Sequence, residues 1–310
     1  MADLPKRRLG RTGADVTTLG FGAMELRGGN RGPQLSEEQA DKLLNAVLDA
    51  GINFIDTSID YGLSEERIGK YISHRRGEYF LASKCGCVYG GEQGEHVHTA
   101  KNIREGVENS LRLLKTDHLD LVQFHRSLTM DEFQAEGALQ EALKLKDEGK
   151  VRFVGVSGTL PNLVEQINSD VFDAFQIPYS ALQREHEDAI ALAASKDMGC
   201  IIRGGVARGA PSDWENRSYY MVPSETMKDR WEEAKLDELL HDGMTRMEFM
   251  LRFTLSHSGL TTTIVGTSNP DHLTSNIEAA MRGPLPEALV TEAKRRLDDA
   301  GAIAEPIIAT

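Results

Sequence analysis

Cysteine is scarce in this chain, and long apolar runs are missing. The 310 residues contain three cysteines, Cys85, Cys87 and Cys200. So sparse and odd a set does not build a disulfide framework. No stretch approaches the roughly 18–20 apolar residues that a membrane-spanning helix needs, and the N-terminus lacks the apolar segment of a secretory signal. We therefore expect a cytoplasmic protein with no membrane association.

Basic residues are also fewer than acidic ones. The chain carries 35 Lys and Arg against 48 Asp and Glu, a formal net charge of −13. Such a surface repels phosphate backbones, which argues against nucleic-acid binding. An anionic cofactor would need a local pocket of basic side chains or backbone amides. The Gly-x-Gly-x-x-Gly fingerprint of open-sheet dehydrogenases is also missing.

Short apolar runs alternate with segments of helical periodicity along most of the chain, which indicates βαβ units and a parallel sheet. The expected strands are residues 19–24, 52–55, 79–82, 119–124, 151–156, 174–177, 199–202 and 262–265. The expected helices are residues 36–50, 65–72, 99–114, 131–148, 161–167, 185–196, 245–256 and 270–281. Eight such units predict an α/β fold, a (β/α)8 TIM barrel forming one domain over residues 1–310. An open doubly wound sheet is the rival fold.

Two additions flank this barrel pattern. Residues 6–9 and 15–18 predict an N-terminal β-hairpin, and residues 286–299 predict an extra C-terminal helix. Ser36 and Gln39 form the capping box of the first helix. The longest irregular region is 207–243, whose aromatic residues would either line the substrate pocket or pack the loop. They are Trp214, Tyr219, Tyr220 and Trp231.

Polar residues end three successive apolar strands. Asp56, Lys84 and His125 occupy these positions, and Tyr61 follows Asp56 by five residues. The C-terminal ends of barrel strands converge on one mouth, where active sites form. We therefore expect these four side chains to lie together and to be catalytic.

The four residue types suit carbonyl reduction. Hydride addition builds negative charge on the carbonyl oxygen, so a proton must be donated there. Tyr61 would act as the general acid, because a neighbouring Lys84 ammonium favours its phenolate. Asp56 would hold Lys84 in place and keep it charged. His125 would hydrogen-bond and orient the carbonyl oxygen.

The strand-two segment 51–65, which contains Asp56 and Tyr61, resembles the aldo-keto reductase superfamily. Residues 83–84, 119–125 and 149–157 are similar to its lysine, histidine and strand-five segments. The resemblance implies a (β/α)8 barrel that uses NAD(P)H, usually NADPH, to reduce a small-molecule aldehyde or ketone, with the reverse oxidation also open. It leaves the substrate and the oligomeric state undetermined.

The resemblance also implies a cofactor site. Ser157 and Gln176 would hold the nicotinamide carboxamide, while segments after strands seven and eight would contact the pyrophosphate and adenosine phosphate. These residues are Arg203, Gly204, Gly205, Val206, Gly209, Gly266, Thr267, Ser268, His272 and Asn276. Three positions depart from the family: Gly158 replaces a usual Asn, Arg203 an aromatic, and His272 an Arg that binds the 2′-phosphate. NADH therefore stays open as the alternative to NADPH.

Other interpretations remain. The chain could be an NADPH-binding redox-sensing or regulatory subunit with slow turnover, or a barrel lyase that forms a Schiff base at Lys84. Cys85, Cys87, His96 and His98 are zinc-ligand types, but their spacing is not that of a zinc knuckle. We expect free thiols and loop histidines there, and no metal site.

Overall fold

The computed structural model describes residues 3–28, 34–91, 94–215 and 222–307. Within these ranges, parallel strands close into a barrel in the order β10-β3-β4-β5-β6-β7-β8-β9. The strands are β3 (Leu19–Gly22), β4 (Phe54–Asp56), β5 (Phe80–Cys85), β6 (Leu119–Phe124), β7 (Val151–Ser157), β8 (Ala174–Pro178), β9 (Gly199–Arg203) and β10 (Thr262–Val265). The predicted (β/α)8 barrel is confirmed, and the sheet is not open.

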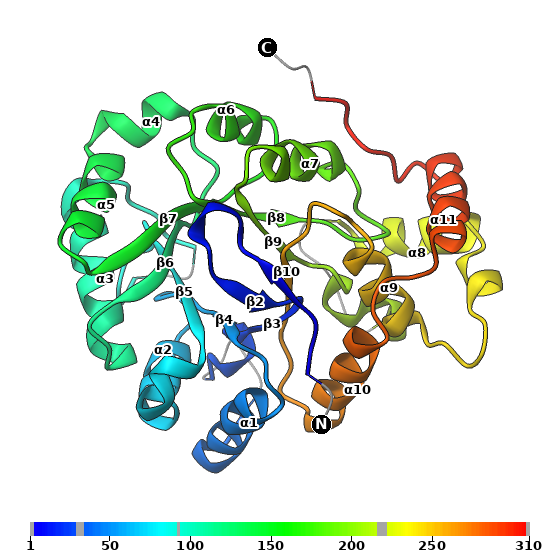
Figure 1. Cartoon of the computed structure of the whole chain (residues 1–310), viewed down its shortest axis with the longest axis horizontal. Helices are drawn as coiled ribbons and strands as arrows, with labels where there is room; N and C mark the ends of the chain where they lie inside the picture. The colour runs from blue at the N-terminus through cyan, green and yellow to red at the C-terminus, as the bar shows by residue number, and fades with distance from the viewer. Residues whose placement is uncertain (1–2, 29–33, 92–93, 216–221, 308–310) are drawn as a thin grey trace.

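Helices surround the barrel, as Figure 1 shows. They are α1 (Glu37–Asp49), α2 (Ser64–Tyr71), α3 (Ala100–Leu114), α4 (Met130–Ala135), α5 (Ala138–Asp147), α6 (Asn162–Asn168), α7 (Glu187–Ser195), α8 (Ser224–Glu233), α9 (Arg246–Leu255), α10 (Pro270–Met281) and α11 (Glu287–Asp299). In the described part of the chain, none of them has the length and apolar composition to cross a bilayer.

Three local predictions have different outcomes. The capping box of α1 is present, because Ser36 accepts from the backbone N–H of Gln39 while the Gln39 side chain accepts from that of Ser36. The single helix expected over residues 131–148 is wrong. Gly137, with φ of 73°, separates α4 from α5. The expected C-terminal helix is confirmed as α11.

The N-terminal hairpin, β1 (Lys6–Arg8) and β2 (Asp15–Thr17), lies across one end of the barrel (Figure 1). Its Leu9 and Val16 side chains are fully buried in a cluster with barrel-interior residues such as Phe54. The backbone N–H of Thr17 donates to Asn53 Oδ1, at 2.7 Å, immediately before β4 begins. The hairpin therefore closes the end where the strands start and leaves the C-terminal ends open for a site.

The region after β9 is only partly irregular. It contains the 3₁₀ helices Ala207–Ser212 and Leu236–Leu239 as well as α8. Trp231 is buried, with its ring centroid 6.5 Å from that of Trp214 and 5.8 Å from that of Phe249. Trp231 therefore packs the core of this region. Tyr219 and Tyr220 lie outside the described residues.

One carboxyl group is sealed between α2 and the barrel. Glu65 is 1% exposed, and its Oε1 accepts a hydrogen bond of 2.6 Å from the Ser83 hydroxyl of β5. Burial raises the pKa of Glu65 from 4.5 to about 7, although the Ser83 hydrogen bond opposes this shift. The folded state therefore retains a proton that the unfolded chain releases between these values, and stability from this group falls as pH rises through that window.

Glu65→Gln should make the protein less sensitive to rising pH. The free energy of unfolding of the variant, relative to the parent, should increase by up to about 3 kcal/mol between about pH 5 and about pH 8. Urea unfolding at a series of pH values measures this difference, in which the histidines common to both proteins cancel. The neighbouring exposed Glu66→Gln is the control. A pH-independent difference for Glu65→Gln would show that Glu65 does not titrate in this range.

Candidate active site

The strand register brings the predicted strand-end residues to one mouth. Asp56 ends β4 and is paired with Ala82 of β5, while Lys84 of β5 is paired with Gln123 of β6. His125 follows β6, and its backbone N–H donates to the Cys85 carbonyl at 3.1 Å. These strands are parallel, so their C-terminal ends lie together, as the sequence predicted.

A buried ion pair lies at the centre of the site. Lys84 Nζ donates to Asp56 Oδ2 at 2.7 Å and to the Thr57 carbonyl at 2.8 Å. Asp56 Oδ1 accepts from the side-chain amides of Gln123 and Gln176, at 3.0 and 2.8 Å. Burial alone would lower the pKa of Lys84, but the hydrogen bond to Asp56 and attraction to Asp56, Tyr61 and Asp60 together outweigh it and raise that pKa. Lys84 is therefore held as an ammonium ion.

Tyr61 and His125 lie next to this ion pair. Lys84 Nζ is 5.0 Å from the centroid of the Tyr61 ring. The Tyr61 and His125 rings meet edge-on, with centroids 5.8 Å apart and planes at 74°. Tyr61 belongs to the loop before α2, where its backbone N–H donates to the Ser58 carbonyl at 3.0 Å. All four candidate catalytic residues are thus grouped.

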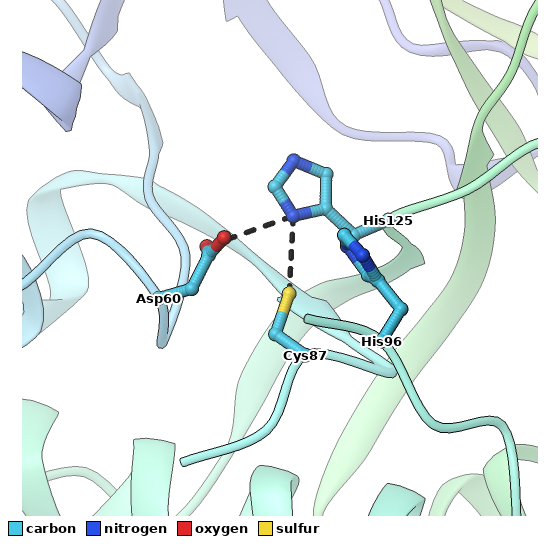
Figure 2. Close-up of side chains that lie close together, drawn as sticks. All are labelled: Asp60, Cys87, His96 and His125. Carbon is cyan, nitrogen blue, oxygen red and sulfur yellow. Dashed lines mark hydrogen bonds and ion pairs between the residues drawn. The ribbon is translucent and has the colours of Figure 1, made fainter. Parts of the chain in front are cut away.

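His125 is supported by residues that the sequence analysis did not assign to the catalytic group. Its Nδ1 is 3.1 Å from Cys87 Sγ and 3.6 Å from Asp60 Oδ1 (Figure 2). Burial and repulsion from Lys84 lower the pKa of His125 well below its ordinary value, so the imidazole is neutral. Burial, with the nearby Asp60 charge, raises the pKa of Cys87 to about 12 and keeps it a thiol.

Gln123 is a further residue that the sequence analysis missed. It is fully buried in β6, and its amide fixes the orientation of the Asp56 carboxylate. The sequence does contain a sign of this role, because Gln123 is a polar residue in the largely apolar run 119–124, two residues before His125. A buried polar side chain requires a hydrogen-bond partner, which here is the carboxylate at the mouth.

The predicted nicotinamide residues are joined to the catalytic group. Ser157 ends β7, and its hydroxyl donates to Gln176 Oε1 in β8 at 3.2 Å. Gln176 in turn donates to Asp56. At Gly158, an added Cβ would lie 2.9 Å from Gln166 Oε1. That oxygen is the far end of the Gln166 side chain, so a larger residue at position 158 would require this side chain to move.

The glycine segments after β9 and β10 have packing roles of their own. An added Cβ at Gly205 would lie 2.7 Å from Thr263 Oγ1, and one at Gly266 would lie 2.6 Å from the Gly22 carbonyl oxygen. Gly204 and Gly209 adopt positive φ of 74° and 83° in the turns between β9 and Ser212. These glycines therefore need no phosphate to explain them.

The remaining predicted cofactor residues lie on three elements at the same barrel end. Arg203 ends β9 and Val206 follows it as a buried side chain. Thr267 and Ser268 precede α10; the Thr267 hydroxyl accepts from the Asn269 N–H at 3.0 Å. His272 is exposed in the first turn of α10, and Asn276, one turn later, is half-buried. These residues therefore follow or end two neighbouring strands, β9 and β10, which are paired in the barrel.

Known proteins share both sequence and fold with this chain. A model of the Aldo/keto reductase family matches residues 18–296. The holo form of an aldo-keto reductase from Bacillus halodurans superposes with a TM-score of 0.80 at 30% identity, covering 94% of this chain and 96% of that one. The uncharacterized oxidoreductase YqkF of Bacillus subtilis is 29% identical over 286 residues, 89% of this chain and 90% of its own. L-galactose dehydrogenase of Arabidopsis thaliana is 27% identical over 298 residues, with 90% and 89% covered. The chain is therefore a member of the aldo/keto reductase family.

Proposed function

We propose that this protein catalyses the NAD(P)H-dependent reduction of a small-molecule aldehyde or ketone to an alcohol, or the reverse oxidation. The observation that carries the proposal is the buried Asp56–Lys84 ion pair next to Tyr61, with His125 against the Tyr61 ring. This arrangement supplies a charged, water-poor environment in which a phenol can exchange a proton with a carbonyl oxygen.

The side chains at the mouth fit a nicotinamide cofactor, which supplies or accepts the hydride when bound. Gln176 Oε1 uses one of its two lone pairs for the Ser157 hydroxyl, so the second can accept from a carboxamide. The Ser157 oxygen can accept as well. We assign the carboxamide to this pair, and the pyrophosphate and adenosine to the segments after β9 and β10.

Each catalytic residue then has one task. Tyr61 gives its proton to the carbonyl oxygen as negative charge builds there, and the Lys84 ammonium stabilises the phenolate left behind. Asp56 holds Lys84 through the 2.7 Å hydrogen bond and is itself fixed by two amides. These contacts are present before any substrate binds, so the acid group is preorganised.

His125 orients the carbonyl oxygen. When the Cys87 thiol donates to Nδ1, the proton of the neutral imidazole resides on Nε2. Nε2 then serves as a hydrogen-bond donor to the developing oxyanion. Cys87 is therefore a positioning residue that acts through His125.

The site disfavours a Schiff-base lyase. A nucleophilic lysine must reach its neutral amine form. The partners of Lys84 instead hold it protonated, through the Asp56 carboxylate and the Thr57 carbonyl. A regulatory, slowly turning subunit would use the same cofactor contacts, but it has no need for the preorganised proton donor.

Tyr61→Phe tests the proton donor. We expect kcat to fall by about 10²–10⁴-fold on any accepted carbonyl, because only the phenolic hydroxyl is removed. A panel of aldehydes and ketones, followed by NAD(P)H absorbance, provides the rates. Tyr71→Phe is the matched control, since that hydroxyl donates to Glu37 on the outside of the barrel. Undiminished turnover in folded Tyr61→Phe would exclude Tyr61 as the acid.

His272→Arg tests the cofactor preference. A guanidinium in the first turn of α10 should raise the affinity for NADPH relative to NADH by about tenfold or more, through a charge-assisted hydrogen bond to the 2′-phosphate. Quenching of tryptophan fluorescence by each cofactor measures both dissociation constants. His241→Arg adds the same charge at an exposed position in the segment between α8 and α9. A parent protein that already binds NADPH far more tightly than NADH would contradict this assignment.

A further inference from the structure

Four side chains of metal-ligating type gather beside the catalytic group. Asp60, Cys87, His96 and His125 each offer one ligand atom, and all four atoms lie within 4.8 Å of one another (Figure 2). The sequence predicted free thiols and loop histidines here, with Cys85 and His98 as neighbours of Cys87 and His96. The structure instead places Cys85 in the hydrophobic core and brings in Asp60 and His125 from other loops.

A short hairpin positions two of these residues. Cys87 and His96 are opposite each other in an antiparallel bridge, flanked by hydrogen bonds from Val88 N–H to the Glu95 carbonyl and from Val97 N–H to the Gly86 carbonyl. Side chains that oppose each other in this way project on the same side. The Asn102 amide of α3 donates to the Val97 carbonyl at 2.7 Å and secures the hairpin.

His96 is oriented as a metal ligand is. Its Nδ1 lies 2.6 Å from the Gly94 carbonyl oxygen, which can only accept, so Nδ1 carries the ring proton. Nε2 therefore presents a lone pair. That atom is buried, and no hydrogen-bond partner for it exists among the described residues. A backbone carbonyl on the second ring nitrogen is the usual outer partner of a metal-bound histidine.

The spacing of the ligand atoms is close to that of a tetrahedral zinc site. Zinc–ligand bonds of about 2.0–2.3 Å place ligand atoms about 3.3–3.6 Å apart. His125 Nδ1 is 3.1 Å from Cys87 Sγ and 3.6 Å from Asp60 Oδ1. The widest separation in the group is at most 4.8 Å, so closure needs a contraction of about 1 Å.

We propose that Asp60, Cys87, His96 and His125 bind a Zn²⁺ ion. On binding, the Cys87 thiol proton leaves to solvent and a Zn–S bond forms. One thiolate, one carboxylate and two neutral imidazoles then balance the ion's two charges, which suits a site close to the buried Lys84 ammonium. Mixed thiolate and imidazole ligands select zinc over Mg²⁺ or Ca²⁺.

The zinc site and the proposed reductase chemistry share His125 without competing for the same atom. Zinc would take Nδ1, while Nε2 lies on the side of the ring away from Cys87 and Asp60 (Figure 2). Metal on Nδ1 places the ring proton on Nε2, the tautomer that donates to a carbonyl oxygen. The inference does not depend on the proposed function, because metal binding is measured without substrate.

The untagged full chain, stripped with a chelator, tests the proposal. Titration with Zn²⁺ against a chromogenic chelator should give one tightly bound ion per chain. Co²⁺ in its place should show thiolate-to-cobalt charge-transfer bands and the visible bands of a tetrahedral ion. A chain that takes up no zinc, or a cobalt spectrum without the thiolate bands, would overturn the site.

Variants locate the ion. His96→Ala, at a half-buried position, should weaken zinc binding by about tenfold or more. Cys87→Ser should abolish the charge-transfer bands. His241→Ala, an exposed histidine in the segment between α8 and α9, should bind zinc as the parent does. An unchanged affinity of His96→Ala for zinc would overturn the proposal. This variant is the deciding test if Cys87→Ser does not fold. Zinc binding without carbonyl reduction would contradict the proposed function alone.

Discussion

The candidate active site depends on keeping an ammonium and a carboxylate charged inside the barrel. Burying an ion costs several kcal/mol unless it is paired and its other hydrogen-bonding groups are satisfied. Lys84 and Asp56 form an ion pair with a 2.7 Å hydrogen bond. The Thr57 carbonyl accepts a second hydrogen bond from Lys84, and the amides of Gln123 and Gln176 donate to Asp56. β4, β5, β6 and β8 each contribute, so a shift in register between any of these strands would leave a buried charge without its partner or without a hydrogen bond.

The ion pair also determines the state of its neighbours. Burial lowers the pKa of His125 well below its ordinary value, and the Lys84 charge lowers it further by disfavouring a second cation. A neutral imidazole has one donor and one acceptor nitrogen, so its partners decide which is which. Cys87 and Asp60 contact Nδ1, which leaves Nε2 for a ligand. The chemistry available to His125 is therefore set by side chains from two other loops.

The sequence predicted the parts of this site that follow from strand geometry. Asp56, Lys84 and His125 could be placed together because parallel strand ends in a barrel meet at one mouth. The grouping of Asp60, Cys87 and His96 could not be predicted, because loop conformation decides where these side chains point. The bridge between Cys87 and His96 is visible only in the structure. The break at Gly137 was missed because the apolar periodicity continues through it.

The predicted cofactor residues show a different limit of prediction from sequence. Gly205 and Gly266 match family positions, yet each is required by close packing within this barrel. A glycine that a neighbouring side chain or backbone demands carries no separate information about a phosphate. In the proposed function, the choice between NADH and NADPH is assigned instead to exposed residues at the start of α10. There Asp271 places a carboxylate at the positive end of the helix, and its own N–H is already taken by Asn269. If the proposed assignment holds, this acidic residue beside His272, on a chain of net charge −13, would weaken the electrostatic attraction for a 2′-phosphate.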